Sequence, residues 1–529
     1  FLQLLGLREG MEALATLSPE AIKSRTIEAM RQLTLKASRR RPIVFVVEDL
    51  HWMDKSSEEC VAAMVQGLAG APVLFLATYR PGYRPSWMDK SYATQIALQP
   101  LSEEDSLTVV HSVLRSEPVP DPVARLILDK AEGNPFFLEE LSRAVREQGA
   151  LQPTLAVPDT IQEVLLARIH RLPEGAKQAL QTAALLGREA SLPLLRSIWD
   201  GPDPLEGHLR DLVRLEFLYE QTEGTEPLYS FKHALTQEVA YASLSAPRRQ
   251  TLHLAAGRAL ETIYADRLSD VYERLAHHYS RTGQAEKATE YLTLFARQAA
   301  TLYAHDEAVR ALQEAQLHAQ RLPVGERDRR RLDLVLRQAS SLFPLGRLQE
   351  ILDLLLPQRE ALERLQDAAL AGHYHFLLGR TYSFLADHER ATQSAQQAIA
   401  EADRCGDATT KGKAYCLLAQ DGALSAKAIE GIAQGRQAVE LLEGTEERSW
   451  LGHAHWVVAL NYLQISSFEP ALEALAKADA IAEVTGDPRL QTVAAWCAGT
   501  LHAVMGNAEA GVAACRRAVE CAPDPLNRA

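Results

Sequence analysis

The segment Arg41-Pro-Ile-Val-Phe-Val-Val-Glu-Asp-Leu-His-Trp-Met-Asp54 joins a short apolar run to a pair of acids. The run Ile43–Val47 is unbroken and rich in β-branched residues, which predicts a strand buried on both faces of a parallel sheet. Glu48 and Asp49 follow it directly. Open α/β sheets bind ligands beyond the carboxyl ends of their strands, and Mg²⁺ prefers oxygen ligands. The segment therefore predicts a Mg²⁺ site at Glu48 and Asp49.

A second strand is predicted to end beside these acids. Ser56-Ser-Glu-Glu59 has the form of a capping box and predicts a helix through Leu68, and Val73–Thr78 is a further apolar run. Strand, helix and strand in about 35 residues predict a right-handed crossover between parallel strands, so Arg80 should share an edge with the acids. One cation beside two acids suits a nucleotide phosphate. The alternative is a surface arginine that opens the Pro81-Gly82 turn.

Composition limits the classes of protein to which the chain can belong. Its 529 residues are 47% apolar and 24% charged, as in a folded protein of several domains. The net charge of −13 disfavours a broad nucleic-acid or anionic-membrane surface. The six cysteines show no metal-ligand spacing, which indicates reduced thiols and a cytoplasmic location. No apolar run reaches the length needed to span a bilayer, so no membrane partner is expected.

The region from 101 to 150 is predicted to hold three helices. Ser102 caps the first, which runs to about Arg115; Asp121-Pro122 begins the second, which ends at Gly133. Asn134-Pro135 begins the third, which runs through Gln148. By pattern alone, Gly133-Asn-Pro135 is a joint between two helices.

The region from 152 to 245 is predicted to be a small domain of helices followed by a hairpin, which matches a winged helix. Val157-Pro-Asp-Thr160 opens its first helix, and His233 follows its last strand. A lone histidine at such a position is more often structural than functional. The expected helices are 161–171, 173–186, 192–199 and 204–215, and the expected strands are 217–219 and 227–231.

From about residue 270 the chain is helical and repetitive. Alanine recurs at positions 398, 438, 478 and 518, with small residues seven and nineteen positions before each. Small side chains at fixed positions let antiparallel helices approach closely, and Leu378-Gly-Arg-Thr-Tyr382 has the tetratricopeptide pattern. The period exceeds the usual unit of about 34 residues, which predicts longer helices or loops. Tyr382, Tyr462 and Trp496 are either ligand anchors on the repeats or packing residues.

Three of these motifs together resemble those of the STAND branch of AAA-type ATPases. Glu48-Asp-Leu-His-Trp-x-Asp54 is similar to the Walker B segment, Gly133-Asn-Pro135 to the motif of the helical lid, and Phe231-Lys-His233 to the end of the winged helix. The resemblance implies a multidomain fold with a partial α/β P-loop ATPase core, a helical lid, a winged-helix-like domain and an all-α tetratricopeptide-like superhelix. The implied boundaries are 1–100, 101–150, 151–245 and 246–529.

The resemblance also implies roles for single residues around ATP or ADP with Mg²⁺. One of Glu48 and Asp49 would hold Mg²⁺ and the other would orient the attacking water, with the assignment open because the family commonly has Asp-Asp or Asp-Glu here. Arg80 would be the sensor arginine near the terminal phosphate. Pro135 would approach the nucleotide from the lid, and His233 would sense bound diphosphate.

The phosphate-gripping loop of the family, Gly-x-x-x-x-Gly-Lys-Ser/Thr, does not occur in this sequence. The family places that loop before the Walker B segment, so we expect this chain, which starts at Phe1, to be a fragment that binds ATP poorly and hydrolyses little. Loss of the ATPase function is the alternative explanation.

Three functions fit the sequence. The first is a signalling switch in which ATP binding and hydrolysis are coupled to a protein or peptide partner, or a ligand, on the repeats, with possible oligomerisation on activation. The second is a non-catalytic repeat scaffold with a structural relic of an ATPase. The third, compatible with the first, is the sensor half of a regulator whose output domain is a class III adenylate or guanylate cyclase or a LuxR-type transcription domain. Nucleic-acid binding by this chain itself is not expected.

Overall fold

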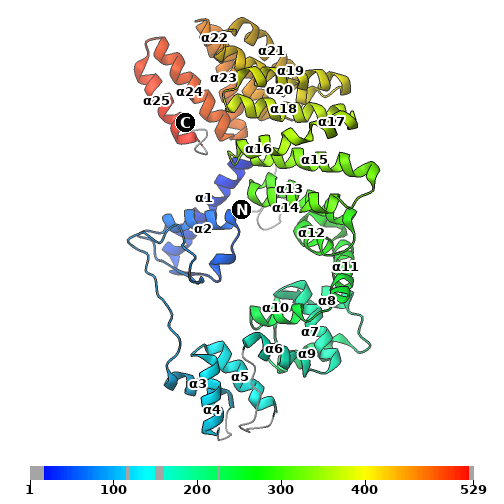
Figure 1. The fold of residues 1–529 in the computed structure, drawn as a ribbon. Coiled ribbons are helices and arrows are strands. Elements are labelled where there is room, and N and C mark those ends of the chain that lie inside the picture. Colours follow the sequence, from blue (N-terminus) through cyan, green and yellow to red (C-terminus); the bar gives the residue numbers. More distant parts are fainter. Residues whose placement is uncertain (1–16, 115–119, 149–159, 224–225, 523–529) are drawn as a thin grey trace. The chain divides into compact units, whose positions relative to one another are not determined.

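The computed structural model describes residues 17–114, 120–148, 160–223 and 226–522, and these are mostly helical (Figure 1). The chain divides into two compact units, one of residues 1–93 with 285–529 and the other of residues 94–284. Each unit has hydrophobic clusters of its own. None of the helices in the described part is both long and apolar enough to cross a bilayer.

The first unit begins with a helix and a strand-helix-strand segment. Ser18 caps the first helix, because its Oγ accepts a hydrogen bond from the backbone N–H of Ala21 at 3.2 Å. The two strands pair in parallel from Ile43 opposite Val73 to Val47 opposite Ala77, which confirms the predicted crossover. The elements are α1 (Pro19–Arg40), β1 (Ile43–Val47), the 3-10 turn η2 (Leu50–Trp52), α2 (Lys55–Gln66) and β2 (Val73–Ala77).

The prediction that the first strand is buried on both faces is wrong for the described residues. Val44 and Val46 are 62% and 56% exposed, and the same face of β2 is open too. Successive side chains of a strand point to opposite faces, and α2 covers only one of them, where Val61 and Val65 pack against Phe75. The described residues of this segment hold two strands only, so the larger α/β core of a P-loop ATPase is not evident in them.

The start of α2 also differs from the prediction. Asp54, not Ser56, caps the helix, because its carboxylate accepts a hydrogen bond from the backbone N–H of Ser57 at 2.9 Å. The helix ends at Gln66 rather than Leu68. A carboxylate at a helix N-terminus also interacts favourably with the helix dipole, so Asp54 is a better cap than the hydroxyl two residues on.

The second unit begins with three helices, α3 (Glu103–Leu114), α4 (Asp121–Ala131) and α5 (Pro135–Gln148), as predicted. The joint between α4 and α5 needs glycine at position 133, which has φ of 72° and whose Cβ would lie 2.6 Å from the Leu101 carbonyl oxygen. The Asn134 side-chain oxygen accepts hydrogen bonds from the backbone N–H groups of Phe136 and Phe137, which fixes the first turn of α5.

The rest of the second unit contains helices and a three-stranded antiparallel sheet of order β3-β5-β4. Thr160 opens the first helix with a capping box to Glu163, while the predicted opening residues 157–159 lie outside the described residues. The short strand β3 was not predicted. The elements are α6 (Ile161–His170), α7 (Glu174–Leu186), β3 (Glu189–Ser191), α8 (Leu192–Ile198), α9 (Leu205–Arg214), β4 (Leu218–Glu223), β5 (Glu226–Phe231), α10 (Ala234–Ala242), α11 (Ala246–Ile263), η3 (Ala265–Val271) and α12 (Tyr272–Ser280).

Helix pairs make up the remainder of the first unit, and the later pairs stack regularly (Figure 1). Helices α18, α20, α22 and α24 begin at 368, 408, 448 and 488, which confirms the 40-residue period. The elements are α13 (Ala285–Thr301), α14 (His305–Ala319), α15 (Val324–Leu342), α16 (Leu348–Leu355), η4 (Leu356–Gln358), α17 (Arg359–Leu365), α18 (Ala368–Phe384), α19 (His388–Cys405), α20 (Ala408–Leu424), α21 (Ala428–Glu443), α22 (Arg448–Gln464), α23 (Phe468–Thr485), α24 (Pro488–Val504) and α25 (Ala508–Cys521).

The long period comes from long helices rather than long loops. From α18 to α24 the helices have 16 to 18 residues, and the turn within each pair is short. A left-handed residue recurs in that turn at Ala386, Ala426, Ser466 and Gly506, again 40 positions apart. Small residues let the paired helices approach, since a Cβ at Gly379 would lie 3.3 Å from the Ala391 carbonyl oxygen.

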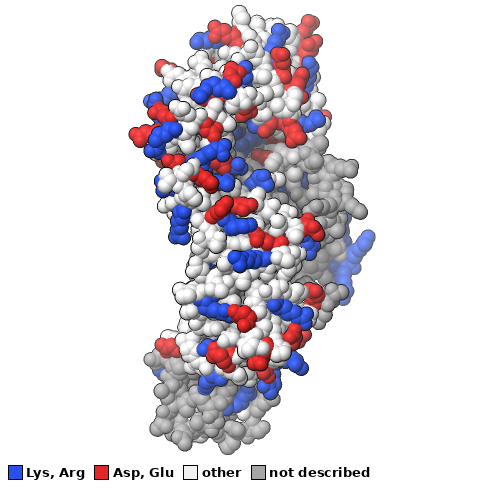
Figure 2. Space-filling view, turned by 90° about the vertical axis from the view of Figure 1, so that its right-hand side faces the viewer, with Lys and Arg blue, Asp and Glu red and all other residues white. Residues whose placement is uncertain are grey.

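Charges of both signs are interspersed on the surface. In the space-filling view, Lys and Arg side chains alternate with Asp and Glu over the described residues of that face, and neither sign forms a continuous patch there (Figure 2). A nucleic-acid interface needs clustered cations, and this face does not present them.

Candidate functional site

Glu48 and Asp49 lie where β1 ends, next to the end of β2. The backbone N–H of Asp49 donates a hydrogen bond to Thr78 Oγ1 at 3.0 Å, and that of Leu50 donates to the Thr78 carbonyl oxygen at 2.8 Å. Asp49 has φ of 54° and ψ of 42°, a left-handed conformation that turns the chain sharply out of the strand. The crossover therefore brings the acids and the residues after β2 to one edge, as the sequence predicted.

Arg80 lies at the same edge but stacks on an aromatic ring. Its guanidinium carbon is 5.2 Å from the centroid of the Trp52 ring, and both side chains are exposed. A guanidinium over an indole face is held by a cation–π interaction and keeps its hydrogen-bond donors available. Trp52, three residues after the left-handed Asp49, thus holds the Arg80 side chain, a contact that the sequence did not single out.

Pro135 and His233 lie together in the second unit. Phe136, next to Pro135, places its ring 4.0 Å from the His233 ring, between centroids. Burial, with the neighbouring Lys232 charge, lowers the pKa of His233, so the ring is neutral at pH 7. Its Nε2 is buried and has no hydrogen-bond partner among the described residues. These two residues share one unit, and Glu48, Asp49 and Arg80 share the other.

A buried ion-pair network connects α5 to the rest of the second unit. Arg168 on α6 pairs with Glu140 on α5, and both side chains are nearly inaccessible to solvent. Burial raises the pKa of Glu140 although Arg168 acts in the opposite direction. Sequence reasoning missed this network, because ion pairs between distant segments leave no local pattern. Its members are Glu139, Glu140, Arg143, Arg168, Glu216 and Lys232.

A group of three histidines is the cluster in the described residues that could hold a metal ion. The Nδ1 atoms of His253 and His278 are 2.9 Å apart and share a hydrogen bond, and His253 Nε2 is 3.0 Å from the Tyr241 hydroxyl. We call His253 and His278 the buried histidine pair. Burial is the main reason that their pKa values fall to about 3 and about 2, so both rings are neutral and each satisfies the other. The third member is the exposed His277.

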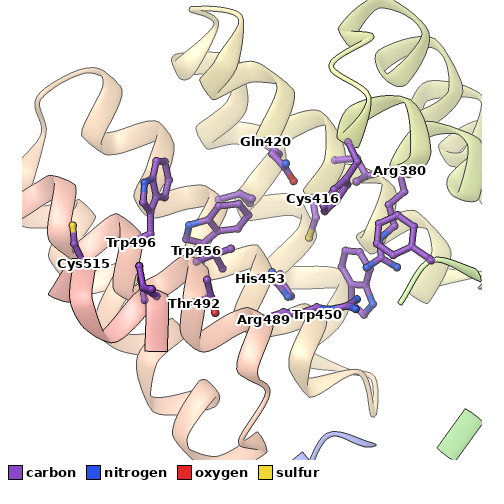
Figure 3. Close-up of a pocket in the computed structure, with 17 residues that line it drawn as sticks. Arg380, Cys416, Gln420, Trp450, His453, Trp456, Arg489, Thr492, Trp496 and Cys515 are labelled. Carbon is purple, nitrogen blue, oxygen red and sulfur yellow. The ribbon is translucent and has the colours of Figure 1, made fainter. Parts of the chain in front are cut away.

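The repeats enclose a cavity of about 550 Å³, which we call the repeat pocket. Side chains from α18, α20, α22, α24 and α25 project into it (Figure 3). Its lining is mainly apolar and aromatic, with a few polar groups, as in small-molecule sites. The lining includes Phe343, Arg380, Cys416, Gln420, Trp450, His453, Trp456, Arg489, Thr492 and Trp496.

One end of the repeat pocket carries two arginines. Arg380, Trp450, His453 and Arg489 gather there, while Trp456 and Trp496 lie towards the other end (Figure 3). The Arg380 guanidinium carbon lies 3.7 Å from the centroid of the Phe343 ring and 5.1 Å from that of Trp450. Burial, together with the charge of Arg489, lowers the pKa of Arg380 to about 9, so it is still a cation at pH 7. Burial lowers the pKa of His453 to about 4, so this ring is neutral.

The arginine end of the repeat pocket reaches the N-terminal part of the chain. Arg489 donates to the Tyr303 hydroxyl at 3.3 Å, and the backbone N–H of Ser18 donates to the Thr485 carbonyl oxygen at 2.7 Å. Burial and the nearby Asp487 carboxylate raise the pKa of Glu20 in the first turn of α1, and Arg489 acts in the opposite direction. Helix α1 therefore begins at the rim of the pocket.

Further contacts hold α1 and α2 to the first repeats. Lys23 lies 5.7 Å from the centroid of the Tyr303 ring, and Lys55 forms an ion pair of 2.8 Å with Asp306. The turn before α24 needs glycine, since Gly486 has φ of 60° and its Cβ would lie 3.1 Å from the Ala21 side chain. These contacts all lie within the first unit.

Most of the repeat pocket was missed by sequence reasoning. Of the three predicted aromatic anchors, only Trp496 lines it, at 46% exposure. Tyr382 is buried in the helical core, and the Tyr462 hydroxyl accepts a hydrogen bond from Arg436. The sequence nevertheless contained a signal for this pocket, because several lining residues occupy equivalent positions of successive repeats, 40 residues apart. One such series is Arg380 and Gln420, and another is Cys416, Trp456 and Trp496.

Comparison with known proteins identifies one of the helix pairs as a tetratricopeptide repeat. Residues 372–403, within α18 and α19, match the tetratricopeptide repeat family. The chain is 27% identical over 335 residues to an uncharacterized protein of Rhizobium meliloti (strain 1021), which covers 60% of this chain and 32% of that protein. The chain thus spans about a third of the length of this curated relative.

Three solved structures resemble the fold. A Signal Transduction ATPase with Numerous Domains (STAND) protein with a tetratricopeptide repeat sensor, from Pyrococcus horikoshii, has a TM-score of 0.40 and 14% identity, covering 94% of this chain and 78% of its own. BtubC from P. vanneervenii has a TM-score of 0.34 and 17% sequence identity, and the match covers 41% of this chain and 91% of BtubC. The apo form of RapI has a TM-score of 0.34 and 12% sequence identity, and the match covers 79% of this chain and 97% of RapI.

Proposed function

We propose that this chain is the sensing part of a cytoplasmic regulatory ATPase of the STAND type. In this proposal a ligand or a protein or peptide partner binds the repeats, and binding is coupled to the state of ATP or ADP with Mg²⁺ at the edge formed by β1 and β2. The output is a cyclase or transcription domain elsewhere in the whole protein, with oligomerisation accompanying activation. The tetratricopeptide repeats support the sensing role, since stacked helix pairs present extended binding surfaces.

One observation carries the proposal. Helix α1 starts at the rim of the repeat pocket, where Ser18 is hydrogen-bonded to Thr485, and runs without a break to Arg40. After two intervening residues β1 begins, and Glu48 and Asp49 follow its last residue directly. A helix of this length is a rigid connection, so a change at the pocket rim has a direct covalent route to the acids.

The proposed chemistry assigns a role to each predicted residue. Glu48 and Asp49 divide the tasks of holding Mg²⁺ and orienting water, and Arg80, held over Trp52, offers its donors to the terminal phosphate. Pro135 and His233 act from the second unit, where the unpaired Nε2 of the neutral His233 ring is suited to accept or donate one hydrogen bond.

The test is ATP binding and turnover by the full-length protein with Glu48→Gln, Asp49→Asn and Arg80→Met. Each substitution should lower turnover by about 10²-fold or more, because phosphoryl transfer depends on charge compensation and positioning. The control is Glu104→Gln, an exposed acid in α3. Turnover that is the same in all four variants and in the wild type would contradict the proposal.

The second candidate is a non-catalytic repeat scaffold. The observation that favours it is the absence of Gly-x-x-x-x-Gly-Lys-Ser/Thr from the sequence, because that loop supplies most backbone contacts to the phosphates in P-loop ATPases. A full-length protein that captures a partner through its repeats but does not bind ATP in equilibrium dialysis would support the scaffold and exclude the switch.

A further inference from the structure

The repeat pocket contains a cation, Arg380, that has no ion-pair partner among the described residues. Among the described residues no acid forms an ion pair with Arg380, whose guanidinium lies over the faces of Phe343 and Trp450. Among the charges that shift its pKa, Arg489 lowers it most, and the Asp487 and Glu20 carboxylates act in the opposite direction. Buried charges in proteins are normally paired with an opposite charge, since removing an unpaired charge from water is unfavourable. A mostly buried guanidinium that faces a cavity is therefore poised for an anion from outside the chain.

The remainder of the cavity determines what kind of anion fits. The indole of Trp456 lines the pocket away from Arg380 (Figure 3) and is 7% exposed, and its Nε1 has no hydrogen-bond partner among the described residues. Trp496 lies beside it and is half-exposed (Figure 3). Two indoles and the aliphatic walls of Leu417 and Val457 suit a flat apolar body. The volume of about 550 Å³ is that of a site for a small molecule.

We infer that the repeat pocket binds a small amphipathic anion, with its carboxylate, sulfonate or phosphate head on Arg380 and a flat apolar or aromatic body between Trp456 and Trp496. This deepens the proposed function by naming the ligand class of its sensor site. Its test uses no ATP, so a failure of nucleotide binding and a failure of this inference are separate results.

An anion in the repeat pocket would also alter the hold on α1. Glu20 and Asp487 lie close enough to Arg489 and Arg380 for their charges to interact. A bound anion competes with these carboxylates for the same two cations. The ligand therefore weakens the attraction between the pocket rim and the first turn of α1, which gives the sensor site an electrostatic route to the N-terminal segment.

The experiment compares two fluorescent probes of similar shape on this full chain. 8-Anilinonaphthalene-1-sulfonate carries an anionic head, and N-phenyl-1-naphthylamine has the same aromatic body without charge. Wild-type protein should bind the sulfonate at least tenfold more tightly. Arg380→Met should weaken sulfonate binding by tenfold to about a hundredfold, the range for a charge-assisted hydrogen bond, and change binding of the neutral probe by less than about twofold.

Three variants separate the inference from a change in folding. Trp496→Ala should weaken both probes, Arg380→Lys should retain more sulfonate binding than Arg380→Met, and Arg404→Met, an exposed arginine on α19, should change neither. Unaltered neutral-probe binding in Arg380→Met shows that the pocket is intact. Equal affinity of the wild type for both probes, or sulfonate binding that Arg380→Met leaves unchanged, would overturn the inference.

The effect on α1 is measured separately by hydrogen exchange of the amides of residues 20–25. Saturating sulfonate should speed their exchange by at least threefold in the wild type and leave it unchanged in Arg380→Met. Equal exchange with and without the sulfonate in the wild type would refute the electrostatic route to α1, while the probe comparison still decides the ligand class.

Discussion

Replacing Arg168 with methionine should strongly destabilise the second unit. Arg168 and Glu140 form the most deeply buried ion pair of the network between α5 and α6, and the Arg168 guanidinium also lies 4.7 Å from the centroid of the Phe217 ring. Met occupies a similar volume, so packing on Phe217 is largely kept. What is lost is the charge, which leaves the Glu140 carboxylate buried with Arg143, at 3.9 Å, as its remaining ion-pair partner among the described residues.

The magnitude follows from the burial of both partners. Both side chains are only 3% to 5% exposed, so solvent screening is weak and the surface value of under about 1 kcal/mol does not apply. Removing one partner of a buried pair costs about 3–5 kcal/mol. The second unit spans residues 94–284, a size at which 1 kcal/mol shifts Tm by about 2–4 °C, so a loss of roughly 6–20 °C is expected.

The loss should depend on pH in a defined direction. Burial already raises the pKa of Glu140 above 4.5, and removing Arg168, which lowers it, raises it further. A carboxyl group with a raised folded-state pKa contributes stability below about pH 4.5 and loses it as pH rises through the folded-state value. The deficit of Arg168→Met should therefore be small near pH 4.5 and grow towards pH 8.

The assay is hydrogen exchange of the amides of α5 and α6 in the full chain at several pH values, after correction for intrinsic rates. A deficit of 3–5 kcal/mol reduces protection by more than 10²-fold when exchange follows unfolding of the unit. The control is Arg168→Met with Glu140→Met, which should recover most of the loss because an apolar pair replaces the ion pair. A pH-independent deficit, or a double variant less stable than the single one, would refute the reasoning.

Three further changes test other parts of the chain. Gly486→Ala should loosen α1, which would be measured as faster amide exchange at residues 20–25. The control is Gly406→Ala, which has the same left-handed backbone but no atom within 4 Å of the added Cβ, and which should only add backbone strain of about 1 kcal/mol. Equal effects of the two variants on α1 would contradict this prediction. Gly431→Ala should destabilise the repeats by about 1–3 kcal/mol, because its Cβ would lie 2.1 Å from the Asn461 side-chain oxygen, and Asn461→Ala should relieve the loss in urea unfolding. Lowering the pH from 7 to 5 should destabilise the second unit by about 2 kcal/mol for each member of the buried histidine pair. The reason is that both histidines have folded-state pKa values far below 6.5, so they stay neutral in the folded protein while the unfolded chain takes up protons. Unchanged exchange protection of α11 between pH 7 and pH 5 would contradict this prediction.

The repeats were predictable because their information is local and repeated. Helical spacing, small residues at fixed positions and a 40-residue period all point to stacked helix pairs, and each pair mainly contacts its neighbours. The crossover between β1 and β2 was predictable for a similar reason, since its length and apolar runs allow few topologies. The exposed face of the strands was not predictable, because an apolar strand has the same sequence pattern whether one or both of its faces are covered.

The edge with Glu48, Asp49 and Arg80 follows from the sequence, but its details do not. These residues were expected to lie together because parallel strands end at a common edge. The structure adds the left-handed turn at Asp49 and the stacking of Arg80 on Trp52. The roles of these residues, and those of Pro135 and His233 in the other unit, stay predictions. The structure of the second unit places Phe136, the neighbour of Pro135, against the His233 ring.

By itself, the sequence determined features that depend on neighbours a few residues apart: the joint between two helices at Gly133, the period of the repeats and the acids at the end of the first strand. Only the tertiary structure decided which side chains from distant elements meet. Arg380 is one residue of a repeat motif in the sequence, yet stacking of four successive helix pairs places it in a cavity with three tryptophans, without an ion-pair partner among the described residues. The pairing of Arg168 with Glu140 and the start of α1 at the pocket rim have the same origin, because electrostatic and packing energies depend on distance in space rather than along the chain.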